Sequence, residues 1–189
     1  VWDDSFAVAY DTMTVTVTNN VTLDPITPST ITVNQDSDTQ TILLSGMYDT
    51  QGGRDVRATA TSSNTTLLAN PTVTTPASDG TATLSYKPTA GKYGTAHVTV
   101  IVRDAGADGT FGNSDDHTTT QTLTIIVNAT PTLGTLPERI GLVPGAGTQT
   151  IQLTGIGPGP GENQSVIVLS SSSDTDLIPT PIVSYTPSS

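Results

Sequence analysis

The sequence contains no cysteine, only 6 lysine and arginine residues, and only 4% aromatic residues among its 189 residues. Without cysteine the chain forms no disulfide and has no thiol nucleophile or cysteine metal site, although this absence does not exclude export. The formal net charge of -11 disfavours binding to nucleic acid or to anionic membranes, so cations are the expected charged partners. The scarcity of aromatic residues argues against a platform for stacking on sugars.

Long hydrophobic runs and good helix formers are scarce as well. No apolar run approaches the roughly 18 residues that span a bilayer, and no basic and apolar leader follows Val1. We therefore expect no membrane insertion of this segment, and we interpret it as part of a longer polypeptide. Thr, Ser, Val, Gly and Pro dominate, and only 12% of residues are charged, which predicts a folded, β-rich protein almost without helix.

Two stretches of the chain match along much of their length. Thr39–Gly46 (TQTILLSG) corresponds to Thr148–Gly155 (TQTIQLTG), 109 positions later, and one inserted residue then raises the offset to 110. Such self-similarity predicts repeated structural units. We predict that residues 1–21 are the C-terminal strand region of a preceding repeat. Residues 22–128 then form a complete repeat, and 129–189 are the truncated N-terminal part of a following one. Half a sandwich is not expected to fold alone.

Apolar residues alternate with polar ones in several segments of the complete repeat, which predicts half-buried strands. The longest such run is Ala96, Val98, Val100 and Val102, and we expect it to form a central strand. Pro and Gly lie between the runs, where turns are expected. The fold class predicted is all-β: tandem Ig-like (cadherin-like) β-sandwich domains of about seven strands each, one complete and two partial.

Four segments carry a resemblance to a known class of repeat: Leu44–Gly46 (LSG), Val56–Asn64 (VRATATSSN), Leu67 with Asn70-Pro71, and Tyr93–Asp104 (YGTAHVTVIVRD). They resemble the cadherin-like and Ig-like repeats of large bacterial surface proteins. The resemblance implies an extracellular or cell-surface location and a non-catalytic role in adhesion, spacing, or matrix or filament assembly. The implied partners are other copies of the chain, neighbouring repeats, or cell-surface and matrix molecules.

The densest cluster of carboxylates lies in Asp104–Asp116 (DAGADGTFGNSDD), between two predicted strands. Counted as a 12-residue calcium loop, its Asp and Gly spacing is similar to that of an EF-hand loop, with a glycine at position six. Four carboxylates within thirteen positions would also repel one another without a cation. The predicted Ca²⁺ ligands are Asp104, Asp108, Thr110, Asn113, Asp115 and Asp116.

A solvated hairpin loop is the other interpretation of this cluster, because Asp and Gly favour turns through side-chain to backbone hydrogen bonds. No catalytic residue is predicted. His97 and His117 are the only histidines and cannot form an ordinary zinc site without cysteine. The run Gly155–Glu162 (GIGPGPGE) lacks the Lys-Ser or Lys-Thr of a phosphate-binding loop and is interpreted as a turn.

Two functional alternatives to a structural array remain open. The chain could be a subunit of an extracellular filament that is assembled by strand exchange, because a strand-bearing tail and an unfinished sandwich lie at its two ends. It could also be an accessory carbohydrate-binding module of a secreted hydrolase, which a row of exposed aromatic residues would favour.

Overall fold

The computed structural model, which describes residues 20–50 and 52–186, contains seven strands, and most of them are rich in Val, Ile and Thr. The strands are β1 (Thr30–Asn34), β2 (Gln40–Leu44), β3 (Val56–Ser62), β4 (Thr72–Val73), β5 (Ala82–Tyr86), β6 (Gly94–Asp104) and β7 (Thr118–Asn128). These residues include no helix, and thus none long and apolar enough to cross a membrane. The prediction of an all-β chain is confirmed.

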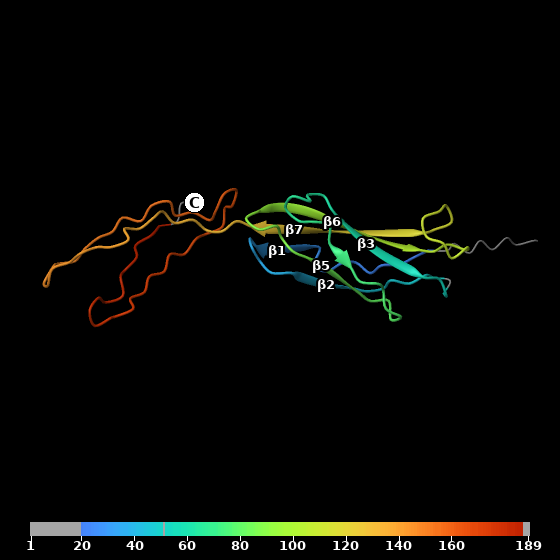
Figure 1. Cartoon of the computed structure of the whole chain (residues 1–189), viewed down its shortest axis with the longest axis horizontal. Helices are drawn as coiled ribbons and strands as arrows, with labels where there is room; N and C mark the ends of the chain where they lie inside the picture. Colours follow the sequence, from blue (N-terminus) through green and yellow to red (C-terminus); the bar gives the residue numbers. More distant parts are fainter. Residues whose placement is uncertain (1–19, 51, 187–189) are drawn as a thin grey trace, which may run out of the picture.

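The strands form two sheets, in the orders β1-β7-β6-β3 and β2-β5-β4 (Figure 1). All neighbouring strands are antiparallel except β1 and β7, which pair in parallel. This order places the third, sixth and seventh strands in one sheet and the second, fourth and fifth in the other, as in an Ig-like sandwich. The predicted seven-stranded, Ig-like sandwich is therefore confirmed.

Alternate residues of β6 and β7 form the centre of the core. Ala96, Val98, Val100 and Val102 of β6 have no solvent exposure, and β7 contributes further buried aliphatic residues. β6 lies between β7 and β3, so the prediction that this run is a central strand is confirmed. Burying each larger aliphatic side chain stabilises a fold by roughly 1.5–3 kcal/mol, so this stripe is a major source of stability.

The turn before β5 depends on a glycine beneath an aromatic ring. Gly80 has a φ of +72°, and a Cβ atom there would overlap the ring of Tyr48. The Tyr48 hydroxyl donates a hydrogen bond to the carbonyl of Asp79 in the same turn. Only glycine satisfies both the backbone conformation and the close contact.

Residues 129–186 repeat part of the hydrogen bonding of the sandwich. In the sandwich, the segment that precedes β1 bonds back to the segment that follows β2. An equivalent pair of bonds recurs later in the chain, with the donor residues 110 positions and the acceptor residues 109 positions further on. The bonds are Thr22 N to Tyr48 O (2.9 Å), Asp24 N to Ser45 O (3.0 Å), Thr132 N to Gly157 O (2.9 Å) and Gly134 N to Thr154 O (2.7 Å).

A capped turn also recurs at an offset of 110. Asn64 Oδ1 accepts a bond from the Leu67 N–H at 3.2 Å, and Asp174 Oδ1 accepts one from the Leu177 N–H at 3.0 Å. The burial of the two leucines differs greatly, because Leu67 is 2% exposed and Leu177 is 76% exposed. Local structure therefore repeats, whereas the core around it does not.

Strand pairing also differs between the two parts of the chain. Residues 129–186 contain no strand, and their only regular pairing is an isolated bridge between Thr132 and Gly157. More than half of the residues in the core cluster of the sandwich come from β5, β6 and β7. Several large apolar side chains of residues 129–186 are exposed.

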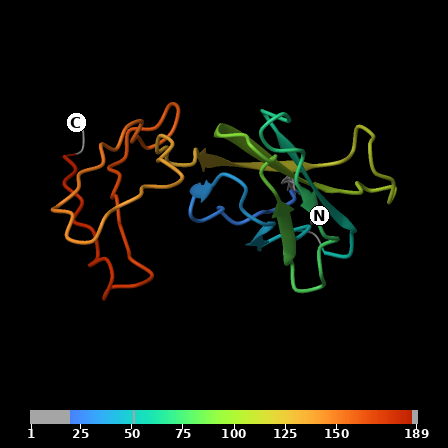
Figure 2. The same cartoon turned by 60° about the vertical axis from the view of Figure 1, so that its left-hand side comes forward.

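Figures 1 and 2 show residues 129–186 beyond the end of the sandwich at which β7 finishes. The two parts follow each other along the long axis of the molecule. The predicted strand region of a preceding repeat falls almost wholly on residues 1–19, which lie outside the described residues. The boundaries of the three predicted repeats stay predictions.

Candidate functional site

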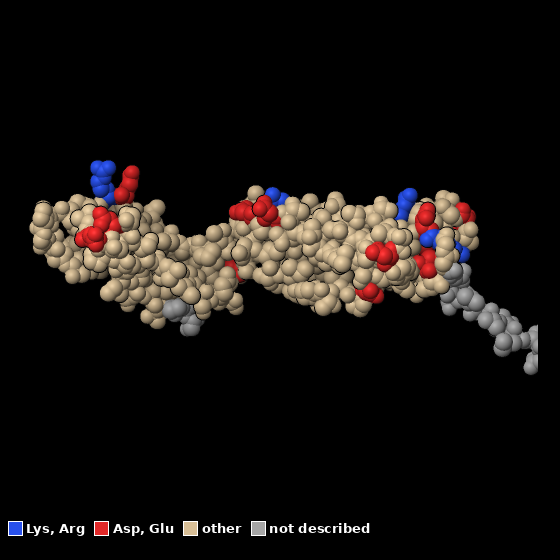
Figure 3. Space-filling model, turned by 90° about the horizontal axis from the view of Figure 1, so that it is seen from below, with Lys and Arg blue, Asp and Glu red and all other residues tan. Residues whose placement is uncertain are grey.

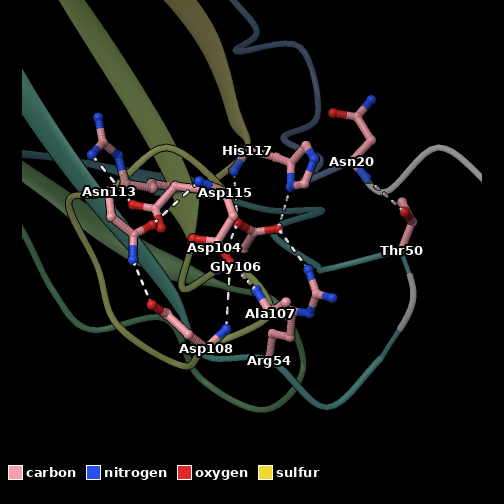
Figure 4. A network of polar contacts seen from close by, with 12 residues as sticks. Asn20, Thr50, Arg54, Asp104, Gly106, Ala107, Asp108, Asn113, Asp115 and His117 are labelled. Carbon is pink, nitrogen blue, oxygen red and sulfur yellow. Dashed lines mark hydrogen bonds and ion pairs between the residues drawn. The ribbon is translucent and has the colours of Figure 1, made fainter.

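The acidic loop connects the two longest strands, from Asp104 at the end of β6 to His117 just before β7. The loop lies at the end of the sandwich where the chain enters at Asn20. Figure 4 shows Asn20 and Thr50 in the same region as His117. All six residues predicted to bind calcium lie in this one loop. Their side chains, however, make different contacts.

Asp104 is the buried anchor of the loop, with a fully buried side chain. Its Oδ1 accepts bonds from the N–H groups of His117 (2.7 Å) and Gly106 (3.1 Å). Its Oδ2 lies 3.2 Å from His117 Nδ1 and 3.9 Å from an Arg54 guanidinium nitrogen. This carboxylate thus joins both ends of the loop to the chain after β2 (Figure 4).

Two opposing effects set the pKa of Asp104. Burial disfavours the charged form and by itself raises the pKa. The N–H groups of His117 and Gly106, followed by the His117 ring, bond to the carboxylate and lower its pKa below the usual 3.8. The charged form of Asp104 therefore stabilises the fold.

Asp115 holds the first turn of the loop. Its Oδ2 accepts a bond from the Ala107 N–H at 2.6 Å and a longer one from the Asp108 N–H at 3.4 Å. The carboxylate packs directly on Gly106, where a Cβ atom would lie only 2.5 Å from Asp115 Cγ. Gly106 also has a φ of +59°, so a side chain at this position is doubly unfavourable.

Asp108 and Asn113 close the tip of the loop. Asp108 Oδ1 accepts a bond from the Thr110 N–H, and its Oδ2 accepts one from the Asn113 side-chain amide, both at 2.7 Å. Asn113 Oδ1 in turn accepts a bond from the Asp115 N–H at 3.3 Å. These contacts are the local side-chain to backbone bonds of an ordinary polar turn.

Asp116 is the second buried carboxylate of the loop, with only 2% of its side chain exposed. Its Oδ2 accepts a bond from the Gly112 N–H at 2.6 Å and lies 3.4 Å from an Arg103 guanidinium nitrogen. Its Oδ1 is buried and has no hydrogen-bond partner. This oxygen is the feature of the loop that best fits a bound cation.

Phe111 attaches the tip of the loop to β3. The Arg57 guanidinium carbon lies 4.2 Å from the centre of the Phe111 ring, at cation–π distance. Beside Phe111 an open cavity of about 650 Å³ lies between β3 and residues 73–78. The tip of the loop therefore contacts β3, which is an edge strand of its sheet.

Within residues 20–50 and 52–186, no three His, Asp or Glu side chains come close enough together to hold a metal ion. The predicted ligands instead accept bonds mainly from the N–H groups of their own loop. The sequence reasoning missed Arg54, Arg103 and His117 as partners of the carboxylates. Arg103 and His117 are adjacent in the sequence to Asp104 and Asp116. This adjacency could have suggested both residues as partners of the carboxylates.

Comparisons with known proteins do not assign the chain to a family. No family model matches the sequence, and no curated protein matches it significantly. Among solved structures, the crystal structure of domains 4 and 5 of the S-layer protein SbsC matches with 15% sequence identity and a TM-score of 0.37. The match covers 57% of this chain and 53% of that one, so this chain spans about half the length of that structure.

We predict that Asp104→Asn lowers the free energy of unfolding by about 1–3 kcal/mol at neutral pH, because buried N–H donors lose a charged acceptor. The folded-state pKa of Asp104 is lowered, so its contribution is present above pH 3.8 and is lost as the pH falls below that value. The difference in the free energy of unfolding between the wild type and the variant should therefore decrease as the pH falls. Urea unfolding at a series of pH values measures it. The exposed Asp108→Asn is the control, and an equal loss in both variants at pH 7 would contradict the assignment.

Proposed function

We propose that this chain is a non-catalytic spacer or stalk segment of a large extracellular or cell-surface protein. The observation that supports this most directly is the parallel pairing of its first and last strands, β1 and β7. The repetition of hydrogen-bonding patterns in residues 129–186, beyond one end of the sandwich, supports a serial array. Its partners in this role are neighbouring repeats, other copies, or cell-surface and matrix molecules.

The parallel pair gives the sandwich a direct way to resist tension. Five residue pairs join β1 to β7, from Thr30 with Thr124 to Asn34 with Asn128. The chain enters before β1 and leaves after β7, at opposite ends of the sandwich (Figure 1). Tension therefore slides the two strands past each other and loads all the ladder bonds together. An antiparallel hairpin pulled at its open end would instead lose them one at a time.

The surface charges suit a spacer better than a protein that binds polyanions. Arg54 and Arg103 are each paired with a buried carboxylate of the acidic loop. On the face shown in Figure 3, charged side chains form separate small groups on a largely uncharged surface, and no continuous basic region is visible. Binding to nucleic acid would need such a region.

Calcium binding by the acidic loop is a second part of the proposal. The buried Oδ1 of Asp116 supports it, because a cation would supply the partner that this oxygen lacks. The other carboxylate oxygens of the loop mostly accept N–H groups, so a bound ion would compete with existing bonds. The affinity expected is that of an extracellular module, with a Kd of about 10⁻⁴–10⁻³ M.

We expect calcium to release or absorb heat on titration into the full chain and to raise its melting temperature relative to chelator. Asp116→Asn should abolish both effects, because it removes a charge from the buried site. The control is Asp79→Asn, an acidic residue in a different turn. Isothermal titration and thermal unfolding measure these effects. Neither heat nor stabilisation in the wild type would rule out the calcium site.

We predict that the sandwich resists force far better along its length than across the β6–β7 hairpin. Cysteines at Asn20 and Pro131 would load β1 and β7 in shear, whereas cysteines at Thr95 and Pro131 would unzip β6 from β7. The natural absence of cysteine makes these attachments unique. Single-molecule pulling should show the higher unfolding force for the first pair. The first pair should also lengthen the chain by roughly 30–40 nm on unfolding. Equal forces would contradict the spacer proposal.

A further inference from the structure

The link between the sandwich and the segment that follows it consists of Ala129 and Thr130, which come directly after β7. The sandwich holds this link through Gln35, which follows β1. Gln35 Oε1 accepts bonds from both the N–H and the hydroxyl of Thr130, each at 3.0 Å. The Gln35 N–H donates to the carbonyl of Asn128 at 2.8 Å. The end of β7 and the link are thus attached to the same residue.

The following segment holds the link from the other side. Glu162 Oε1 accepts a bond from the N–H of Ala129 at 2.8 Å. Gly159 packs so closely on the link that a Cβ atom there would lie 2.7 Å from both Ala129 Cβ and the Thr130 carbonyl oxygen. Ala129 is only 4% exposed as a result of these contacts. The run Gly155–Glu162, which was interpreted from the sequence as a turn, therefore packs against the link.

An equivalent loop occupies the same place at the start of the sandwich. Residues 48–50 and 52–53 lie 109 positions before residues 157–159 and 161–162 and likewise follow the second segment of their repeat. There the hydroxyl of Thr50 accepts a bond from the N–H of Asn20 at 3.2 Å. One loop uses a hydroxyl and the other a carboxylate. By the offset of 110, Asn20 corresponds to Thr130, so the two loops bind the backbone at neighbouring positions rather than at the same one.

We propose that residues 157–162 are a latch that fixes the orientation of one repeat relative to the repeat before it in the chain. The latch acts on the preceding sandwich through the link: it contacts Ala129 and Thr130, and Thr130 in turn binds Gln35 of the sandwich. A two-residue link would otherwise rotate about its backbone torsions, because domains joined by a small interface move relative to each other. Gln35 and Glu162 restrain these torsions by binding the N–H groups of both link residues. The inference rests on the proposed serial array.

The test measures the distance between the two parts in the full chain. Spin labels on cysteines that replace the exposed Thr61 and Thr135 report this distance by pulsed electron paramagnetic resonance, and the chain has no other cysteine. We expect one narrow distance distribution in the otherwise unchanged chain. Glu162→Ala and Gly159→Ala should each broaden it, the first by removing the acceptor and the second by pushing the loop off Ala129.

Gly147→Ala is the matched control, because a Cβ atom at Gly147 meets no other atom within 4 Å. It should leave the distribution narrow. The melting temperature of the sandwich should be the same in all variants, which separates loss of the latch from loss of folding. A distribution that is already broad in the unchanged chain, or one that stays narrow in both latch variants, would overturn the proposal. Neither result would affect the pulling experiment, which tests the spacer role through the sandwich alone.

Discussion

The rest of the structure depends on one contact between the two sheets. Alternate residues of β6 and β7, which are neighbours in one sheet, point into the core between the sheets. Val98, Val100 and Val102 on one strand and Ile125 and Val127 on the other have no solvent exposure. Both ends of the molecule are attached to these two strands. The acidic loop joins them at one end, and the link to residues 129–186 continues from β7 at the other. Residues 129–186 contain no strand, and several of their large apolar side chains are exposed.

Tension, orientation and stability are connected through the same few contacts. β7 pairs with β1 in parallel, and Gln35, directly after β1, binds both the end of β7 and the link. A force that arrives at the link is therefore passed to the ladder of β1 and β7. At the opposite end, the buried carboxylates of Asp104 and Asp116 fix the loop against Arg54 and Arg103. Both ends of the proposed spacer are thus held by specific polar contacts around an apolar centre.

Much of the fold could be predicted from the sequence, because strands with one buried face alternate apolar and polar residues. Alternation located β6 and its central place. The repeat that the recurring TQTI motif indicates stays a prediction. The loop was harder, because its Asp and Gly spacing fitted both a calcium site and a solvated turn, and neither pattern names the partners of its carboxylates. In the structure these partners are mainly backbone N–H groups, together with Arg54, which lies 50 positions before Asp104. A contact between residues so far apart leaves no periodic signal. The role of Gly159 was hidden for the same reason, since its neighbour Ala129 lies 30 positions earlier.

The most direct test of this account is calorimetric unfolding of residues 22–128 alone, compared with the full chain. Because the core lies almost wholly within this range, we predict a single cooperative transition at nearly the same temperature in both proteins. The absence of a cooperative transition in the fragment would mean that the sandwich depends on neighbouring chain. That result would contradict its description as an independent unit of a serial array.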